Sequence, residues 1–193
     1  MKIVSRILLF TAISIILILF GLHIWLKQRV DNVIDKETYS HLVEEIKASE
    51  DLPDRFYGIY GQVTEFDENS TTNKFLFFRL LQRERKPCPC VDVAYGVTFN
   101  SIDMLSVGLS LDKDVSPKKC LDFYLSRFDF LYSTIGIQNA SKFYYQKDLE
   151  QLNDDEMFEL SVMTLNPAFY NKIRRPDSLK EKVEEVKMNK MQK

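Results

Sequence analysis

An uncharged apolar run near the amino terminus constrains this chain more than any other feature. Residues 7–26, ILLFTAISIILILFGLHIWL, contain no charged side chain. A helix of about 20 apolar residues can cross the hydrocarbon core of a bilayer. A cleavable signal peptide has a shorter apolar run and a small-residue cleavage site, whereas this run ends beside Trp25 and Lys27. We therefore expect residues 1–30 to form an uncleaved membrane anchor, with Trp25 at the bilayer interface.

The charges beside this run do not fix its orientation. Lys2 and Arg6 precede the run, and Lys27 and Arg29 follow it, so the positive-inside comparison is a tie. The free amino terminus adds a positive charge on its own side and favours that end inside. We therefore expect the main domain to lie outside the cytoplasm.

The net charge of the remaining chain argues against one class of partner. Four of the 26 basic residues flank the apolar run, which leaves 22 basic against 28 acidic residues in 31–193, a net charge of −6. A nucleic-acid-binding domain normally carries a basic surface. We therefore expect no nucleic-acid partner. The basic residues that follow position 171 predict a charged carboxy-terminal tail over 172–193, which is either a solvated terminal helix or a fraying end.

The three cysteines leave the redox state open. Cys88 and Cys90 form a C-x-C pair, and Cys120 lies apart from them. One such pair without a nearby histidine is a poor zinc signature, so we expect neither a metal nor a cofactor. In an oxidising compartment Cys120 can pair with Cys88 or Cys90, whereas buried free thiols explain the same residues equally well.

Most of the remaining chain carries helix signals. Residues 31–51 are predicted to form a charged helical stalk, and a further helix is predicted to start at Pro53. The segment FLFFRLLQRERK (75–86) fits either a core helix with a basic end or an interfacial helix that touches lipid. The stretch KPCPCVDVAYGVTFN (86–100) is the least helical, and a short hairpin or an irregular loop is expected there.

The carboxy-terminal part shows the clearest helix starts. Ser116 before a proline predicts an N-cap with proline at the first helical position. Residues 136–145 predict another helix. Asn153 predicts an N-cap, and Glu156 falls where its carboxylate closes a capping box. The expected domain is therefore predominantly α-helical.

Three of these segments, in this order, resemble one known family. SPKKCLDFYLSR begins at Ser116, with Asp122 where that family has Glu; IGIQNASKFYYQK begins at Ile135; and DLEQLNDDEMFELSVMTLNPAFYN runs from Asp148 to Asn171. Glu156 occupies the position of the family's structural Glu. These segments are similar to the family 51 glycosyltransferases, the peptidoglycan transglycosylases.

The resemblance implies an architecture, a location and partners. It implies a mainly α-helical, lysozyme-like domain of transglycosylase type over residues 52–171, behind the single transmembrane helix. It places the chain in the bacterial inner membrane, with the main domain facing the periplasm or the cell exterior. The implied partners are the lipid bilayer, a lipid-linked peptidoglycan precursor and cell-wall synthesis proteins.

The residues for chemistry fit the family less well than the scaffold does. The family's catalytic Glu aligns with Thr64, one residue before Glu65, and its basic pair and second Glu align with Asn100, Ser101 and Met104. One hypothesis is an active, divergent glycosyltransferase that uses Glu65 as the base. Its cations for the leaving diphosphate would be Arg83, Arg85 and Lys86.

A second hypothesis is a degenerate domain that binds a partner or a lipid-linked glycan without turning it over. The sequence favours this hypothesis, because the scaffold segments are present and the catalytic motifs are not. A third hypothesis is an unrelated helical protein tethered to a membrane.

Overall fold

The structure is a computed structural model that describes residues 2–83 and 86–191. Over these residues the chain is mainly helical, as expected, and its β pairing is a single bridge between Asp129 and Ile135. The elements are α1 (Lys2–Val33), α2 (Lys36–Ala48), α3 (Asp54–Thr64), α4 (Thr72–Phe77), the π-helix η1 (Phe78–Gln82), α5 (Pro89–Gly96), α6 (Ser101–Asp114), α7 (Pro117–Arg127), α8 (Ile137–Tyr145), the 3₁₀-helix η2 (Leu149–Gln151), α9 (Asp154–Met163) and α10 (Pro176–Met191).

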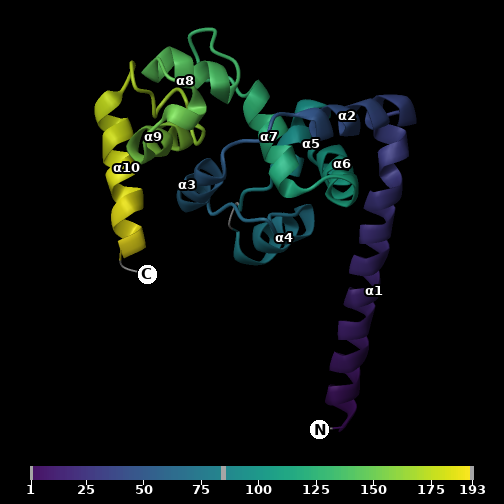
Figure 1. Cartoon of the computed structure of the whole chain (residues 1–193). Coiled ribbons are helices and arrows are strands. Elements are labelled where there is room, and N and C mark those ends of the chain that lie inside the picture. The colour runs from purple at the N-terminus through teal and green to yellow at the C-terminus, as the bar shows by residue number, and fades with distance from the viewer. Residues whose placement is uncertain (1, 84–85, 192–193) are drawn as a thin grey trace.

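The first helix projects away from the rest of the protein (Figure 1). Its candidate membrane span is Leu8–Val33, within which an 18-residue window has a mean hydropathy of 2.4, so the helix is long and apolar enough to cross a membrane. Its carboxy-terminal end is fixed to α6. The Ser106 hydroxyl donates to the carbonyl of Leu26 at 2.6 Å, and Arg29 Nε lies 2.6 Å from Asp103 Oδ1. The direction of α1 relative to the domain is therefore set by its contacts with side chains of α6.

The core consists of two apolar clusters that meet at α7. One cluster is built from α3, α8, α9 and α10 with one side of α7. The other is built from α2, α5 and α6 with the opposite side of α7. Tyr124 of α7 packs against both clusters. α7 therefore positions the two halves of the domain against each other.

The helix starts expected in the carboxy-terminal part are confirmed. The side chain of Ser116 accepts the amide of Lys119, with proline at the first position of α7. The side chain of Asn153 accepts the amide of Glu156, whose carboxylate accepts the amide of Asn153 in return. Each cap satisfies amides that have no partner within the helix, so the local sequence is enough to start it.

The expectation of a hairpin or loop in the cysteine-rich stretch is wrong. Residues 89–96 form α5, with Pro89 in its first turn. Cys90 and Ala94 are completely buried, and Val93 is nearly so. Packing of this apolar face overrides the preference of the β-branched residues for strands.

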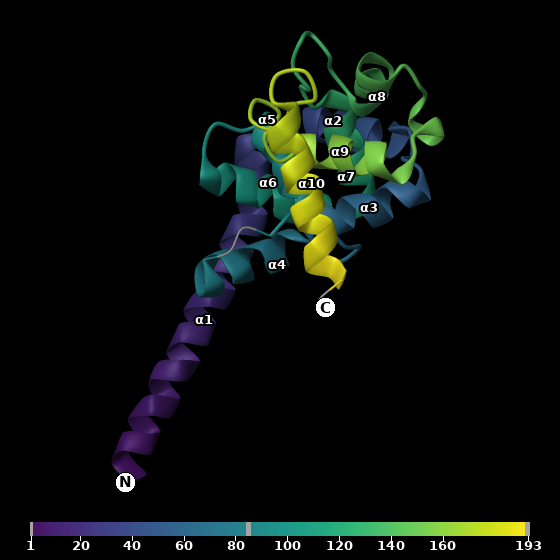
Figure 2. The same ribbon diagram turned by 90° about the vertical axis from the view of Figure 1, so that its left-hand side faces the viewer.

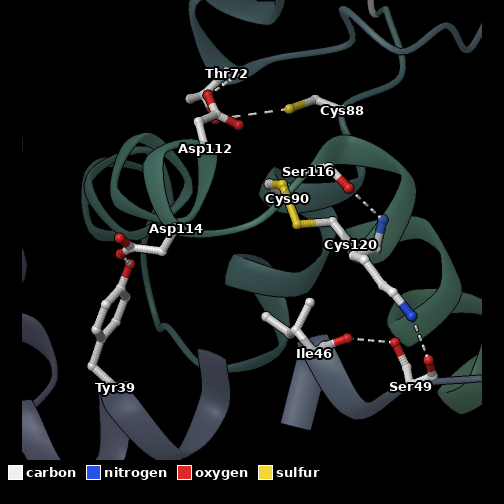
Figure 3. The surroundings of a disulfide bond; sticks show 11 residues. Tyr39, Ile46, Ser49, Thr72, Cys88, Cys90, Asp112, Asp114, Ser116 and Cys120 are labelled. Atoms are coloured by element: carbon white, nitrogen blue, oxygen red, sulfur yellow. Dashed lines mark hydrogen bonds between the residues drawn. A yellow bond between two sulfur atoms is a disulfide. The ribbon is translucent and has the colours of Figure 1, made fainter. Parts of the chain in front are cut away.

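A disulfide fixes α5 to α7 (Figure 3). Cys90 is bonded to Cys120, and their Cα atoms lie 5.1 Å apart. Cys88 is a buried free thiol whose sulfur lies 3.8 Å from the hydroxyl of Thr72. Burial, the main cause, raises the pKa of the Cys88 thiol to about 12. Cys88 is therefore expected to stay protonated and unreactive at neutral pH.

The carboxy-terminal segment forms a helix, one of the two expected forms, but one side of it is buried and not solvated. Residues 176–191 form α10, and its Leu179, Val183 and Val186 are buried against the cluster that contains α9. These positions recur every three to four residues and give the helix one apolar stripe.

The stalk predicted over residues 31–51 also packs against the domain. Leu42, Val43 and Ile46 of α2 are buried. The division of the chain at residues 30, 51 and 171 stays a prediction.

Candidate functional site

A cleft of about 630 Å³ opens between the two halves of the domain. It is bordered by the end of α3, by α4, by the segment that leads into α5, by α7 and by the segment after α9. The lining residues are Tyr60, Val63, Thr64, Glu65, Phe75, Lys86, Pro87, Cys88, Asp92, Tyr124, Phe128, Thr164, Leu165 and Pro167. The cleft therefore combines an aromatic wall with a small number of charged groups, as ligand sites generally do.

Two of the predicted site residues, Glu65 and Lys86, meet in this cleft. Glu65 caps the end of α3 in the left-handed conformation, with φ of 64°. Its Oε2 forms an ion pair with the Lys86 ammonium group, which also lies 5.3 Å from the centre of the Phe78 ring. The two groups are 21 residues apart in the sequence. In this structure the positive charge of Lys86 is therefore balanced by Glu65.

The other predicted cations are not brought into the cleft. Arg83 caps the end of η1 with φ of 55°, is exposed, and is not among the described residues that line the cleft. Arg85 lies outside the described residues. Of the three predicted cations, Lys86 is therefore the one that lines the cleft within the described part of the chain.

The structure adds Asp92 and Tyr60, which sequence reasoning missed. Asp92 lies in the first turn of α5, and Tyr60 lies in α3, 32 positions earlier in the sequence. Burial and then the charge of Asp92 raise the pKa of the Tyr60 hydroxyl, and a hydrogen bond with Thr164 opposes the shift. Asp92 could be recognised as a cleft residue only if residues 89–96 were known to form a helix. We expected a hairpin or a loop there instead.

The residues at the expected catalytic positions stabilise the fold. The Thr64 hydroxyl donates to the carbonyl of Tyr60 at 2.8 Å, within the last turn of α3. Met104 is partly buried against the cluster that contains α5 and α6. The side chain of Asn100 accepts the amides of Ile102 and Asp103 and so caps α6. These side chains cannot accept the proton of an acceptor hydroxyl or neutralise a diphosphate.

Asp103, the carboxylate nearest in the sequence to the expected second Glu, also forms its contacts outside the cleft. Asp103 faces α1, where the Arg29 guanidinium, its main partner, lowers the pKa of the carboxyl below its ordinary value. The side chain of Asn100 also donates to Asp103 Oδ2 at 2.6 Å. One residue along a helix corresponds to a rotation of about 100°. Asp103 thus points towards α1 and not into the cleft.

The scaffold carboxylates Asp122 and Glu156 have structural roles. Asp122 is buried and accepts hydrogen bonds from the Tyr57 hydroxyl and the Leu52 amide. Burial raises the pKa of Asp122, although the bond from Tyr57 opposes that shift. Glu156 closes its capping box and pairs with Lys147 at 2.7 Å. Among the described residues, no group of three or more His, Cys, Asp or Glu side chains is placed to hold a metal ion.

Comparison with known proteins agrees with the resemblance seen in the sequence. Residues 101–192 match the Transglycosylase family. The chain is similar to penicillin-binding protein 1F of Bacillus subtilis (strain 168), with 33% identity over 76 residues, which are 39% of this chain and 11% of the relative. The aligned part is thus about a tenth of that protein's length, and Glu65 and Lys86 lie before the range that matches the family. Residues 101–192 of this chain are therefore similar to the transglycosylase family.

Proposed function

We propose that this protein is a membrane-anchored, transglycosylase-like domain that binds a lipid-linked glycan in its cleft without polymerising it. One observation carries the proposal: the family scaffold is present, while the positions expected to do the chemistry hold Thr64, Asn100, Ser101 and Met104. The transition state needs a base for the acceptor hydroxyl, a contribution of about 10²–10⁴-fold. It also needs preorganised cations for the leaving diphosphate.

The ion pair between Glu65 and Lys86 supports a binding role. An ammonium group in a cleft can donate a hydrogen bond to a phosphate oxygen, and a bound diphosphate would compete with Glu65 for the Lys86 ammonium group. The aromatic wall formed by Tyr60, Tyr124 and Phe128 suits the faces of sugar rings. Both features act on a ground-state ligand, and binding by itself does not accelerate a reaction.

The proposed location is the bacterial inner membrane, with the domain outside the cytoplasm. The helix α1 is long and apolar enough to serve as the anchor. The disulfide between Cys90 and Cys120 supports the orientation that the flanking charges leave open, because disulfides persist in oxidising compartments. The proposed protein partners belong to cell-wall synthesis.

A second candidate function is an active, divergent glycosyltransferase with Glu65 as the base. The observation that favours it is the position of Glu65 and Lys86 in one cleft, since a base and a cation are the two groups that the reaction requires. Asp92 lines the same cleft and adds a second carboxylate. The two candidates differ in one measurable property, the formation of glycan chains.

The test uses the purified full-length chain and a labelled lipid-linked disaccharide. Binding is measured in detergent micelles, and polymer is measured after prolonged incubation. We expect binding without polymer. We also expect Lys86→Met to weaken binding at least about tenfold, since a hydrogen bond to a charged group contributes about 1.5–3 kcal/mol. The matched control is Lys118→Met, because Lys118 pairs with Asp54 at 3.0 Å on another surface.

Two results would contradict the proposal. Chain formation by the wild type that disappears in Glu65→Gln would establish the second candidate and identify the base. Equal binding by wild type and Lys86→Met would remove the cleft as the ligand site.

A further inference from the structure

Another pocket, of about 410 Å³, adjoins the cleft that contains Glu65 and Lys86. It lies between α2, α5 and α7, and both α2 and α5 pack against α7. Asp92, Tyr124 and Phe128 line the pocket as well as the cleft. A substituent of a ligand in the cleft can therefore reach this pocket.

Two walls of the pocket are fixed to each other by a covalent bond. The disulfide between Cys90 and Cys120 joins α5 to α7. Asp92 follows Cys90 by two positions, and Tyr124 follows Cys120 by four, which is about one helical turn. The pocket is therefore preorganised, and a ligand loses little binding free energy to the ordering of its walls.

Aromatic side chains form much of the surface of this pocket. Among the described residues they are Tyr95, Phe123, Tyr124 and Phe128, and we call the space they line the aromatic pocket. The rings of Tyr124 and Phe128 lie 5.5 Å apart with 66° between their planes, so their faces point in different directions. Tyr95 is 75% exposed and accessible to a ligand. Several aromatic faces around one space are typical of sites that bind ammonium groups.

One aromatic face of the pocket already contacts a cation. The Cζ atom of Arg127 lies 3.8 Å from the centre of the Phe123 ring. The attraction arises because the face of an aromatic ring carries partial negative charge. The remaining faces of the aromatic pocket therefore offer the same attraction to a cation of the ligand.

The charges of the aromatic pocket favour a cationic ligand as well. Within the described part of the chain, its charged lining residues are Glu45, Asp92 and Arg127, two carboxylates and one guanidinium, with a net charge of −1. Arg127 Nη2 lies 3.1 Å from Glu45 Oε2, and these side chains are 55% and 41% exposed. Ion pairs that are exposed to this extent are weak, so a second cation can compete for Glu45.

The position of the aromatic pocket argues against the lipid part of the ligand as its occupant. The cleft is bordered by α4, whereas the aromatic pocket is bordered by α2. In both views α2 lies farther than α4 from the amino terminus of α1 (Figures 1 and 2). The path from the cleft to the aromatic pocket thus leads away from a bilayer crossed by α1. A group that enters it belongs to the polar part of the ligand.

We propose that the aromatic pocket binds a primary ammonium group carried by a substituent of the glycan in the cleft. The inference rests on the proposed function, since the ligand is the lipid-linked glycan. The amine-bearing side chain of a peptide attached to the sugar has the required chemistry. Its methylene groups would contact the apolar walls, and its ammonium group would meet the aromatic faces and the carboxylates of Glu45 and Asp92. The aromatic pocket would then select glycans by the charge of this substituent.

The experiment compares two forms of a lipid-linked disaccharide that carries a peptide. One form has a free primary amine on the peptide, and in the other form that amine is acetylated. Dissociation constants are measured with the purified full-length chain in detergent micelles. Acetylation removes the charge and keeps the rest of the ligand, so the ratio of the two affinities reports on the ammonium group. We expect the wild type to bind the amine form at least about fivefold more tightly, the scale of a cation–π contact.

Two substitutions should move this ratio in opposite directions. Tyr95→Leu removes an aromatic face and keeps an apolar side chain, so the ratio should fall towards one. Arg127→Met removes the cation that pairs with Glu45, so the ratio should rise by up to about fivefold, the scale of an exposed ion pair. A variant that only loosens the fold would weaken both forms alike and leave the ratio unchanged.

The matched control is Tyr132→Leu, which should keep the wild-type ratio. Tyr132 is 49% exposed in the loop between α7 and α8, and it is not among the described residues that line the aromatic pocket.

Equal affinities of the wild type for the two forms would overturn the inference and leave the proposal for the cleft standing. A wild-type ratio that persists in Tyr95→Leu would place the ammonium group outside the aromatic pocket and would also overturn the inference. Absence of binding by both forms would contradict the proposed function on which the inference rests.

Discussion

Reduction of the bond between Cys90 and Cys120 should lower the stability of the domain by an amount that follows from the length of the loop it closes. The two cysteines are 30 residues apart. In the chain-entropy treatment, closing a loop of that length lowers the entropy of the unfolded chain by about 12 cal/mol/K, or about 3.6 kcal/mol at 25 °C. Both residues are completely buried, so the released thiols stay in the core. Most of the expected loss therefore arises in the unfolded chain.

The assay compares thermal unfolding of the full-length protein in detergent with and without a phosphine reductant. For a chain of this length, 3.6 kcal/mol corresponds to a fall in the midpoint of about 7–14 °C. Counting thiols under denaturing conditions should give one free thiol before reduction and three afterwards. Cys88→Ala keeps the disulfide and should show the same response to the reductant, whereas Cys120→Ala should show none.

Three free thiols in the untreated protein would refute the reasoning at its first step. A single free thiol together with an unchanged midpoint would refute its second step, the entropic cost of opening the loop. The reductant response of Cys88→Ala separates both outcomes from an exchange in which Cys88 replaces one of the partners.

Three further predictions concern the scaffold and its orientation. Asn153→Ala should destabilise the domain by about 1 kcal/mol through loss of the cap, and Leu160→Ala, a completely buried position, by about 2–5 kcal/mol; an unchanged unfolding midpoint for Leu160→Ala would contradict the burial. Because the pKa of Asp122 is raised in the folded state, its contribution to stability is present below the ordinary aspartate pKa of about 3.9 and is lost as pH rises through the raised value. The unfolding free energy of wild type relative to Asp122→Asn should therefore fall across that window, and a difference independent of pH would count against it. Protease added to spheroplasts should degrade residues 34–193, and full protection would place the domain in the cytoplasm.

Much of the fold could be predicted because the relevant signals are local. The run at residues 7–26 predicts a long apolar helix from composition alone, and length and hydropathy suffice for that inference. Ser116 and Asn153 predict helix starts because each cap bonds amides within its own first turn. The family resemblance of the carboxy-terminal half could likewise be recognised from residue types in order.

The candidate site was predicted only in part, because its geometry depends on contacts between distant segments. Glu65 and Lys86 could each be chosen by residue type, but their ion pair results from how α3 and the segment before α5 pack. Asp92 was missed because an eight-residue helix with β-branched residues has no clear period. The pairing of Cys90 and not Cys88 with Cys120 was equally undecidable, since both cysteines are close neighbours in the sequence.

The sequence by itself determined where the apolar helix lies, where the capped helices begin and which family the carboxy-terminal half resembles. The tertiary structure alone decided that α10 packs by one stripe, that Asp103 faces Arg29 and that Cys90, not Cys88, pairs with Cys120. The physical reason is the range of the interactions. Caps and hydrophobic runs act within a few residues, whereas burial, ion pairing and exposure are set by which distant surfaces meet.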